Sequence, residues 1–281
     1  MYIIDGKKIR EEILAEIKQE VARLPFTPLF CDVLVGNDFV SKKYVKMKAQ
    51  IARSLGIDFN DASFPATITT EELVKEIKKL NQIKNMCGII IQLPLPESID
   101  RRAVLDAIDP ELDVDCLGSV ASENFYKGQV DFGFPTALAC VAVLDSLNLD
   151  LKEKKIVVLG QGELVGKPTM AFLRLRGLFP IAVDRSTENK ETIIKEADVI
   201  ISGIGKGKHI TGDMIKKGVV LIDAGTSESS NSLVGDVDLE SVKNVASAVS
   251  PVPGGVGPVT VAMLFRNVLR VAQAKMTKKD E

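Results

Sequence analysis

The stretch Lys155-Ile-Val-Val-Leu-Gly-Gln-Gly-Glu-Leu-Val-Gly-Lys-Pro168 joins an apolar run to a turn with three glycines, and a helical pattern follows it up to Arg176. Val and Ile favour a buried strand, and glycine permits a tight turn that a ligand can approach closely. A strand, a glycine turn and a helix in this order place backbone N–H groups where a pyrophosphate can bind. The spacing is GxGxxxG rather than GxGxxG, so a turn used only for packing is the alternative to the dinucleotide site that we predict.

Six further apolar runs have the length and the Val and Ile content of buried strands. They are Phe30–Val35, Ile57–Phe64, Gly88–Leu93, Ile181–Asp184, Asp198–Ser202 and Val219–Asp223. Helical patterns lie between most of them. Near-continuous apolar strands separated by helices are typical of parallel sheets covered on both faces, so we predict an α/β fold.

The alternation of strands and helices pauses over residues 109–134, which are polar and contain glycine, and it resumes with a helix predicted over 136–147. We therefore expect two domains with parallel sheets. The first comprises residues 1–135 and 262–281, and the second, of Rossmann type, comprises residues 136–261. A cleft between two such domains is the usual place for a ligand.

The composition points to a small-molecule partner. The chain has 281 residues, 46% of them hydrophobic, and its 36 basic and 38 acidic residues form no long block of one sign. This pattern predicts neither a nucleic-acid surface nor a polybasic membrane patch. No apolar run approaches the ~20 residues of a membrane helix, and no leader pattern is visible, so we expect a cytoplasmic protein. Four scattered cysteines and one histidine lack the spacing of a metal site.

The segment Ser250-Pro-Val-Pro-Gly-Gly-Val-Gly-Pro-Val-Thr260 contains three prolines and three glycines. Proline fixes φ, and glycine lets another molecule lie against the backbone. We expect a shaped loop over 250–260, followed by a helix over 261–271, although such a run often serves only as a connection.

A helix is predicted over residues 41–55, with Ser41 as its N-cap and Gly56 as its stop. At 100° per residue, one stripe of this helix holds Tyr44, Lys48, Ile51 and Leu55. Lys48 is the one charge on that stripe. It either extends its amine to solvent from an apolar surface or faces a cleft, where partial burial would make it competent for proton transfer, with Tyr44 one turn away.

Polar residues follow two predicted elements of the first domain. Gln92 ends an apolar strand, at the edge where open α/β sheets bind ligands. Asp113 and Asp115 lie on the same side of an extended segment. The two carboxylates could cap a turn, accept paired N–H donors of a heterocycle or, least expected, coordinate a metal.

Seven segments together resemble the bifunctional methylenetetrahydrofolate dehydrogenase/methenyltetrahydrofolate cyclohydrolase family. Their order and spacing match over nearly the whole chain, and the YxxxK, IIIQLPLP and PVPGGVGP patterns are specific in combination. The segments are Tyr44–Lys48, Gly88–Pro96, Asp113–Asp115, Gly160–Pro168, Asp223–Gly225, Gly235–Val237 and Pro251–Pro258.

The resemblance implies oxidation of 5,10-methylenetetrahydrofolate to the methenyl form with NADP or NAD, then hydrolysis to 10-formyltetrahydrofolate in the same cleft, without a metal. By likeness, Lys48 is the catalytic lysine and Tyr44 stacks on the folate. Gln92 supports the lysine and the substrate, and Asp115 holds the pterin. The other implied site residues are Leu93, Pro253, Gly254 and Gly255 beside the folate, and Gly160, Gln161, Gly162, Val165, Gly166, Asp184, Arg185, Gly203 and Gly225 beside the dinucleotide.

This chain departs from the family pattern in four places. Phe134–Ala139 stands where PCTPxG is usual, and Cys116 stands where Gly follows the paired aspartates. Gly160–Gly162 reads GQG instead of GRS, which removes an arginine available to a 2′-phosphate, and Asp184-Arg185 replaces HS. NADP is the family default, but Asp184 could instead bond the ribose 2′-hydroxyl of NAD, so the choice between them stays open.

Two alternatives to the full activity follow from these departures. One is a catalytically degraded protein that still binds folate or nucleotide, and the other is a dehydrogenase without the cyclohydrolase step. As with its relatives, a homodimer is expected.

Overall fold

The computed structural model describes residues 1–229 and 232–277. It divides into two compact units. Unit 1 comprises Met1–Glu12 and Phe134–Met263, and unit 2 comprises Ile13–Gly133 and Leu264–Glu281. Residues 278–281, which the sequence assigned to the first domain, lie outside the described residues.

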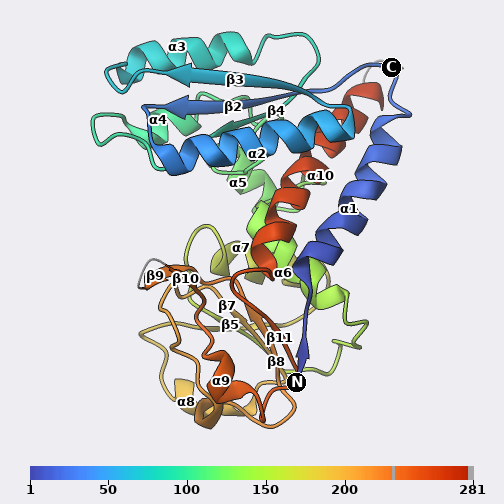
Figure 1. Cartoon of the computed structure of the whole chain (residues 1–281), viewed down its shortest axis with the longest axis vertical. Helices are drawn as coiled ribbons and strands as arrows, with labels where there is room; N and C mark the ends of the chain where they lie inside the picture. Colours follow the sequence, from blue (N-terminus) through green and yellow to red (C-terminus); the bar gives the residue numbers. More distant parts are fainter. Residues whose placement is uncertain (230–231, 278–281) are drawn as a thin grey trace. The chain divides into compact units, whose positions relative to one another are not determined.

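Unit 2 is built on a three-stranded parallel sheet in the order β3-β2-β4 (Figure 1). Its strands are β2 (Leu29–Val35), β3 (Asp58–Phe64) and β4 (Met86–Ile91). Helix α2 (Phe39–Leu55) connects β2 to β3 and packs on both strands, and α3 (Thr70–Leu80) connects β3 to β4. β2 is therefore the central strand, which pairs with β3 over Leu29–Val35 and with β4 over Leu29–Val33.

Helices complete the core of unit 2. They are α4 (Arg101–Leu105), α5 (Ser119–Tyr126), the later part of α1 (Gly6–Val21) and the later part of α10 (Val256–Thr277). Phe30 of β2 meets Phe265 of α10 edge to face at 5.5 Å. The Asn267 amide donates to the carbonyl oxygens of Val114 and Gly133 at 2.8 and 2.6 Å. These contacts fix α10 against the loop that carries Asp113 and Asp115.

Unit 1 is a six-stranded parallel sheet in the order β1-β11-β8-β7-β5-β6. Alternate residues, among them Val157, Ile200 and Leu221, pack in one apolar cluster with Ile194 and Val242. Helices α6 and α7 pack against each other and against β8 and β5. The elements are β1 (Tyr2–Ile3), α6 (Pro135–Asp145), β5 (Ile156–Leu159), α7 (Gly166–Leu175), β6 (Ile181–Val183), α8 (Lys190–Glu196), β7 (Val199–Ser202), a 3₁₀ turn (Gly212–Met214), β8 (Val220–Asp223), the hairpin β9 (Ser227–Ser229) and β10 (Ser232–Val234), α9 (Leu239–Val242) and β11 (Ala248–Ser250).

The first twelve residues are placed differently from the predicted division. The sequence put residues 1–135 in one domain, but β1 is an edge strand of the unit 1 sheet, pairing Tyr2 with Ala248 and Ile3 with Val249. A two-residue strand leaves no periodic signal in the sequence, and its position depends on a partner at the other end of the chain.

Helix starts also differ from prediction. The N-cap of α2 is Asp38, whose Oδ2 accepts the backbone N–H of Ser41 at 2.7 Å, so Ser41 is a first-turn residue and not the cap. Gly56, with φ of +79°, ends the helix as predicted. Helix α10 begins at Val256, inside the predicted loop, because a proline such as Pro258 is tolerated in a first turn.

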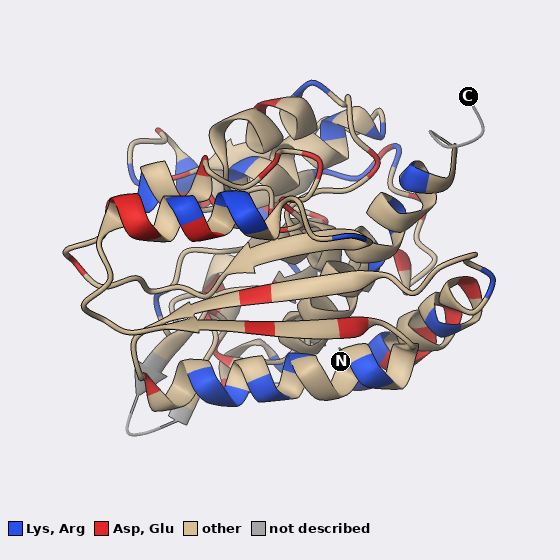
Figure 2. Cartoon of the chain, turned by 90° about the horizontal axis from the view of Figure 1, so that it is seen from above, with Lys and Arg blue, Asp and Glu red and all other residues tan. Residues whose placement is uncertain are grey.

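Charged residues are dispersed over the surface. Positions of both signs are spread over many elements in Figure 2, whereas α2 carries basic residues only, at Lys42, Lys43, Lys46, Lys48 and Arg53. None of the helices in the described ranges is long and apolar enough to span a bilayer.

Candidate active site

Lys48 occupies the buried side of α2. That side consists of Ser41, Val45, Lys48, Ala52 and Leu55, and Lys48 is only 7% exposed. Its Nζ lies 2.8 Å from Oε1 of Gln92 and 2.7 Å from Oδ2 of Asp32. The amine therefore points toward the sheet and is held by two polar groups, in contrast to a lysine that extends into solvent.

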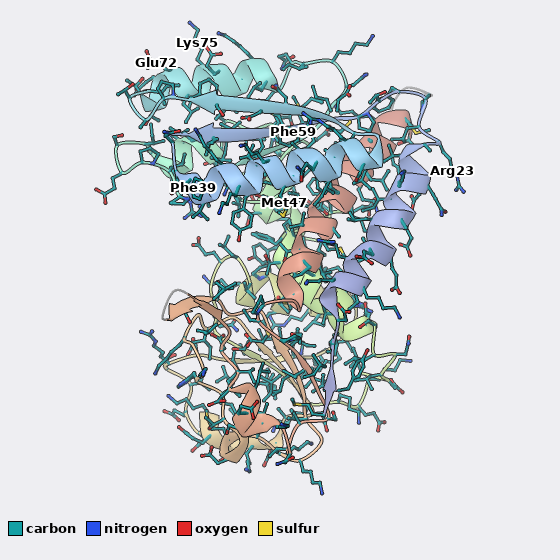
Figure 3. All side chains as sticks on the ribbon, in the orientation of Figure 1. Arg23, Phe39, Met47, Phe59, Glu72 and Lys75 are labelled. Atoms are coloured by element: carbon teal, nitrogen blue, oxygen red, sulfur yellow. The ribbon has the colours of Figure 1, made fainter. Side chains whose placement is uncertain are left out.

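Tyr44 does not share this buried side. The predicted stripe included it, but its side chain is 51% exposed. The buried side is set one residue later than predicted, at Val45, because that is where α2 meets the sheet. Figure 3 shows α2 from Phe39 at its start to Met47 near its middle, beside the strand that carries Phe59. An exposed ring one turn before Lys48 remains available to stack on a ligand.

Gln92 follows β4 directly. Its backbone N–H donates to the Val33 carbonyl at 2.8 Å, which extends the pairing of β4 with β2 by one residue. Its side-chain Nε2 donates to the Leu93 carbonyl at 3.2 Å. That bond directs Oε1 toward Lys48, so Gln92 both ends the strand and orients the amine.

Asp113 and Asp115 differ in their surroundings. Asp113 is buried, and its Oδ2 accepts the Gly118 N–H at 2.7 Å, so one predicted alternative, the capping of a turn, holds for this residue. Asp115 is half-buried and makes no such cap. Burial raises the pKa of Asp115 to about 7, opposed by the charge of Lys48 and reinforced by Asp113 and Asp32. The Asp115 carboxyl can therefore gain or lose a proton near neutrality.

Asp32 is a site residue that the sequence analysis missed. It lies in the middle of β2 and is fully buried beside Lys48. A charged residue within the apolar run Phe30–Val35 was the available signal. Groups of three or more metal-ligating side chains are not found in the part of the chain that the structure describes.

The glycine turn of unit 1 has the geometry of a phosphate-binding turn. Gly160 has a φ of +83°, and a Cβ on Gly166 would lie 1.8 Å from the Gly160 carbonyl oxygen, so both positions require glycine. A Cβ on Gly162 would meet nothing within 4 Å. The first turn of α7 has no side-chain cap, but the Lys167 N–H already donates to the Gly162 carbonyl at 3.1 Å and Pro168 has no N–H, so few donors of this turn remain for an anion. The glycine positions fit a dinucleotide.

The other predicted dinucleotide residues lie around the ends of the strands. A Cβ on Gly203 would lie 2.7 Å from the Val165 side chain, and one on Gly225 would overlap the Asp236 carboxylate. The Gln161 amide donates to the carbonyl oxygens of Val158 and Gly160 at 3.3 and 3.0 Å. Gly203 and Gly225 thus permit close packing, and Gln161 braces the turn.

Two protein-family models match separate stretches of this chain. Residues 4–115 match the model of the tetrahydrofolate dehydrogenase/cyclohydrolase catalytic domain, and residues 135–276 match that of its NAD(P)-binding domain. The chain belongs to the tetrahydrofolate dehydrogenase/cyclohydrolase family. The predicted family and enzyme class are confirmed, and so is the α/β fold with a Rossmann-type second domain.

Individual members of the tetrahydrofolate dehydrogenase/cyclohydrolase family are similar over nearly their whole length. The bifunctional protein FolD of Nautilia profundicola is 40% identical over 277 residues, which cover 97% of this chain and 98% of that protein. The crystal structure of the Campylobacter jejuni FolD methylenetetrahydrofolate dehydrogenase/cyclohydrolase superimposes with a TM-score of 0.92 at 32% identity, covering 98% and 99% of the two chains. The Trypanosoma brucei enzyme, complexed with NADP and an inhibitor, gives a TM-score of 0.89 at 32% identity, covering 98% of each chain.

In this family member, the residues after β6 are exposed. Asp184 Oδ1 accepts the backbone N–H and hydroxyl of Ser186 at 2.9 and 2.7 Å and the Thr187 hydroxyl at 3.2 Å. These hydrogen bonds lower the pKa of Asp184, so it is ionised at neutral pH. Arg185 beside it is also exposed. Asp184 therefore caps its own turn, and its carboxylate is still exposed.

The Pro/Gly segment forms a shorter loop than predicted. It follows β11 and turns at Gly254, which has a φ of +105°. The Gly254 carbonyl accepts the Gly6 N–H at 2.9 Å, and the Gly255 N–H donates to Pro251 at 2.7 Å. A Cβ on Gly255 would lie 2.6 Å from the Pro251 oxygen, so this position is closed to larger residues.

Proposed function

We propose that this chain oxidises 5,10-methylenetetrahydrofolate with NAD(P)⁺ and hydrolyses the resulting methenyl cation to 10-formyltetrahydrofolate, with Lys48 as the proton-transferring group. The observation that carries the proposal is the buried Lys48 amine, held between Gln92 and Asp32. Family membership supports the same reaction pair.

The oxidation requires positioning more than acid–base chemistry. Loss of a hydride from the methylene bridge gives a cation shared by its two nitrogens, and the bound nicotinamide supplies the hydride acceptor. The protein has to hold the folate in one orientation. Tyr44 offers an exposed ring for stacking, and Asp115 offers a carboxylate for the pterin N–H groups. Pro253, Gly254 and Gly255, and the Gln92-Leu93 backbone, would complete the folate-binding surface.

The hydrolysis requires proton transfer. Water adds to the methenyl carbon and loses one proton, which leaves a hydroxyl group on that carbon. The hydroxyl then loses its proton as the carbonyl forms, and the bond from the carbon to N5 breaks as N5 gains a proton, which leaves the formyl group on N10. One proton is released overall. The Lys48 amine is the group proposed to pass a proton from the attacking water to N5, and Gln92 keeps the amine directed.

Paired assays test this proposal. Purified protein with methylenetetrahydrofolate and NAD⁺ or NADP⁺ is expected to produce reduced nicotinamide, and added methenyltetrahydrofolate is expected to disappear faster than in buffer. Binding of both ligands without turnover would establish the degraded protein instead. Accumulation of the methenyl product would establish a dehydrogenase without the second step.

We expect the affinity for folate to depend on pH through Asp115. Burial sets the pKa of this carboxyl at about 7, and only the ionised form accepts two N–H donors. KM for methylenetetrahydrofolate is therefore expected to rise as the pH falls from about 8 to about 6. In Asp115→Asn, KM is expected to be high throughout that range and to vary less with pH. A wild-type KM that is constant over the same range would contradict this role.

We propose NAD as the preferred cofactor, because the ionised Asp184 would repel a 2′-phosphate and can bond a 2′-hydroxyl. Asp184→Asn is expected to raise the ratio of kcat/KM for NADP⁺ to that for NAD⁺ by about tenfold, which corresponds to ~1.4 kcal/mol. Arg185→Ala is expected to lower that ratio. A wild type that prefers NADP⁺, together with an unchanged ratio in Asp184→Asn, would contradict the proposal. The cofactor preference would then be set by Arg185.

The homodimer and the cytoplasmic location are proposed on family likeness. Light scattering on the purified protein and fractionation of the source cells check them.

A further inference from the structure

Asp32 is the one charged residue of β2, the central strand of the unit 2 sheet. Its neighbours along the strand, Cys31 and Val33, are fully buried, as is Asp32 itself. A carboxylate placed in a paired central strand loses its hydration on both sides, and this is strongly unfavourable unless another group compensates it. The buried Asp32 carboxylate therefore needs a compensating partner.

The compensating group is Lys48. Its Nζ lies 2.7 Å from Asp32 Oδ2 as an ion pair, and among residues 1–229 and 232–277 no other cation pairs with this carboxylate. The two Asp32 oxygens make no well-angled hydrogen bond with the described residues. The charge of Lys48 is therefore what stabilises the ionised form of Asp32, and Asp32 in turn holds the amine on which the proposed reaction depends.

Other ionisable groups face the pair from each neighbouring element. Asp61 of β3 stands opposite Asp32 in the sheet register, but it is exposed and accepts a hydrogen bond from the Ser63 hydroxyl. Asp115 approaches from the loop after α4, with Asp113 acting on Asp115, and Gln92 approaches from the end of β4. Burial raises the pKa of Asp32, Lys48 opposes this, and Asp61 reinforces it. The Lys48 amine thus interacts with both Asp32 and Asp115, and Asp32 is the carboxyl in direct contact with it.

We propose that Asp32 is a positioning residue for Lys48: its carboxylate holds the amine beside Gln92, at the end of β4. This inference rests on the proposed function. Asp32 acts only through Lys48, since it is buried and does not itself reach the surface. Removal of this anion takes away the ion pair that holds the Lys48 amine in place.

The test is Asp32→Asn, which keeps the shape and removes the charge. The pH–rate profile of cyclohydrolase turnover is expected to shift, with kcat at the wild-type optimum falling about tenfold or more. KM for the dinucleotide, which is bound by unit 1 residues, is expected to stay unchanged. Asp61→Asn is the matched control, because it removes a carboxylate in the same register row that does not touch Lys48. It is expected to leave the profile in place.

A double-mutant cycle separates positioning from a structural role. In a Lys48→Gln background, Asp32→Asn is expected to have no further effect on residual hydrolysis, because the group through which it acts is gone. If Asp32→Asn does not fold, Asp32→Ser, which leaves room for a water molecule, is expected to give the same shift. If the wild type is active and the folded Asp32 variant has an unshifted pH–rate profile, the inference about Asp32 is wrong and the proposed function still holds. A wild type without either activity overturns the proposed function.

Discussion

Replacement of Lys48 by methionine is expected to lower cyclohydrolase turnover by a factor of about 10²–10⁴, the range that a positioned acid–base group supplies. Methionine fills similar space on α2 but has no proton to exchange. The measurement is the rate of methenyltetrahydrofolate loss at saturating substrate. Unchanged hydrolysis in the folded variant would remove Lys48 from the mechanism.

The same substitution is expected to destabilise the protein in a pH-dependent way. Without Lys48, the buried Asp32 carboxylate loses its partner, which costs about 3–5 kcal/mol while it remains ionised. Burial already raises the pKa of Asp32, and loss of the amine raises it further. A carboxyl whose pKa is higher in the folded than in the unfolded state stabilises the fold at pH values below its unfolded-state pKa. This stabilisation is lost as the pH rises through the folded-state pKa. The deficit relative to wild type is therefore expected to be large near pH 8 and small near pH 4.

Lys46→Met serves as the control for both measurements. Lys46 lies on the same helix two residues earlier, but its side chain is exposed. Chemical denaturation and the hydrolysis assay are expected to show values close to wild type for this variant, since exposed substitutions change stability by only about 0.5 kcal/mol. A similar loss in Lys46→Met would indicate a general effect of charge on α2.

The long strands were predictable because each carries its own apolar pattern. All seven predicted runs are strands in the structure, within about two residues at each end. The short strands β1 and β11 were not predicted, because they exist only through pairing with one another and with β8. The helices predicted after Pro168 and from residue 261 both start too late, since α7 begins at Gly166 and α10 at Val256, and a first turn accepts glycine and proline.

The site was predictable in part. The sequence placed Lys48 on an apolar helix side and Gln92 at a strand end, and the structure brings their polar atoms within 2.8 Å. It placed Tyr44 on the buried side of the helix, but the side chain is exposed. Adjacent residues point 100° apart around a helix, and only the contact with the sheet decides which of two neighbours is buried. Asp32 was missed because its partner lies on another element. A charge within an apolar strand is the pattern that would have revealed it.

The glycine turn allows packing and ligand binding to be separated by two substitutions. Gly166→Ala is expected to destabilise unit 1 strongly, because the new Cβ would lie 1.8 Å from the Gly160 carbonyl oxygen and the backbone would have to shift. We expect a loss of about 2–4 kcal/mol, at or above the usual cost of overpacking. Chemical denaturation measures it.

Gly162→Ala is expected to give the opposite combination. Its Cβ would meet nothing within 4 Å, so the free energy of unfolding is expected to stay within about 0.5 kcal/mol of wild type. If a pyrophosphate lies against this turn, the added methyl group blocks its approach to the backbone, and KM for the dinucleotide is expected to rise about tenfold or more. Hydrolysis of added methenyltetrahydrofolate needs no dinucleotide and is expected to continue. A stable variant with unchanged KM would mean that the turn serves packing alone, because a bound pyrophosphate and an added methyl group cannot occupy the same space.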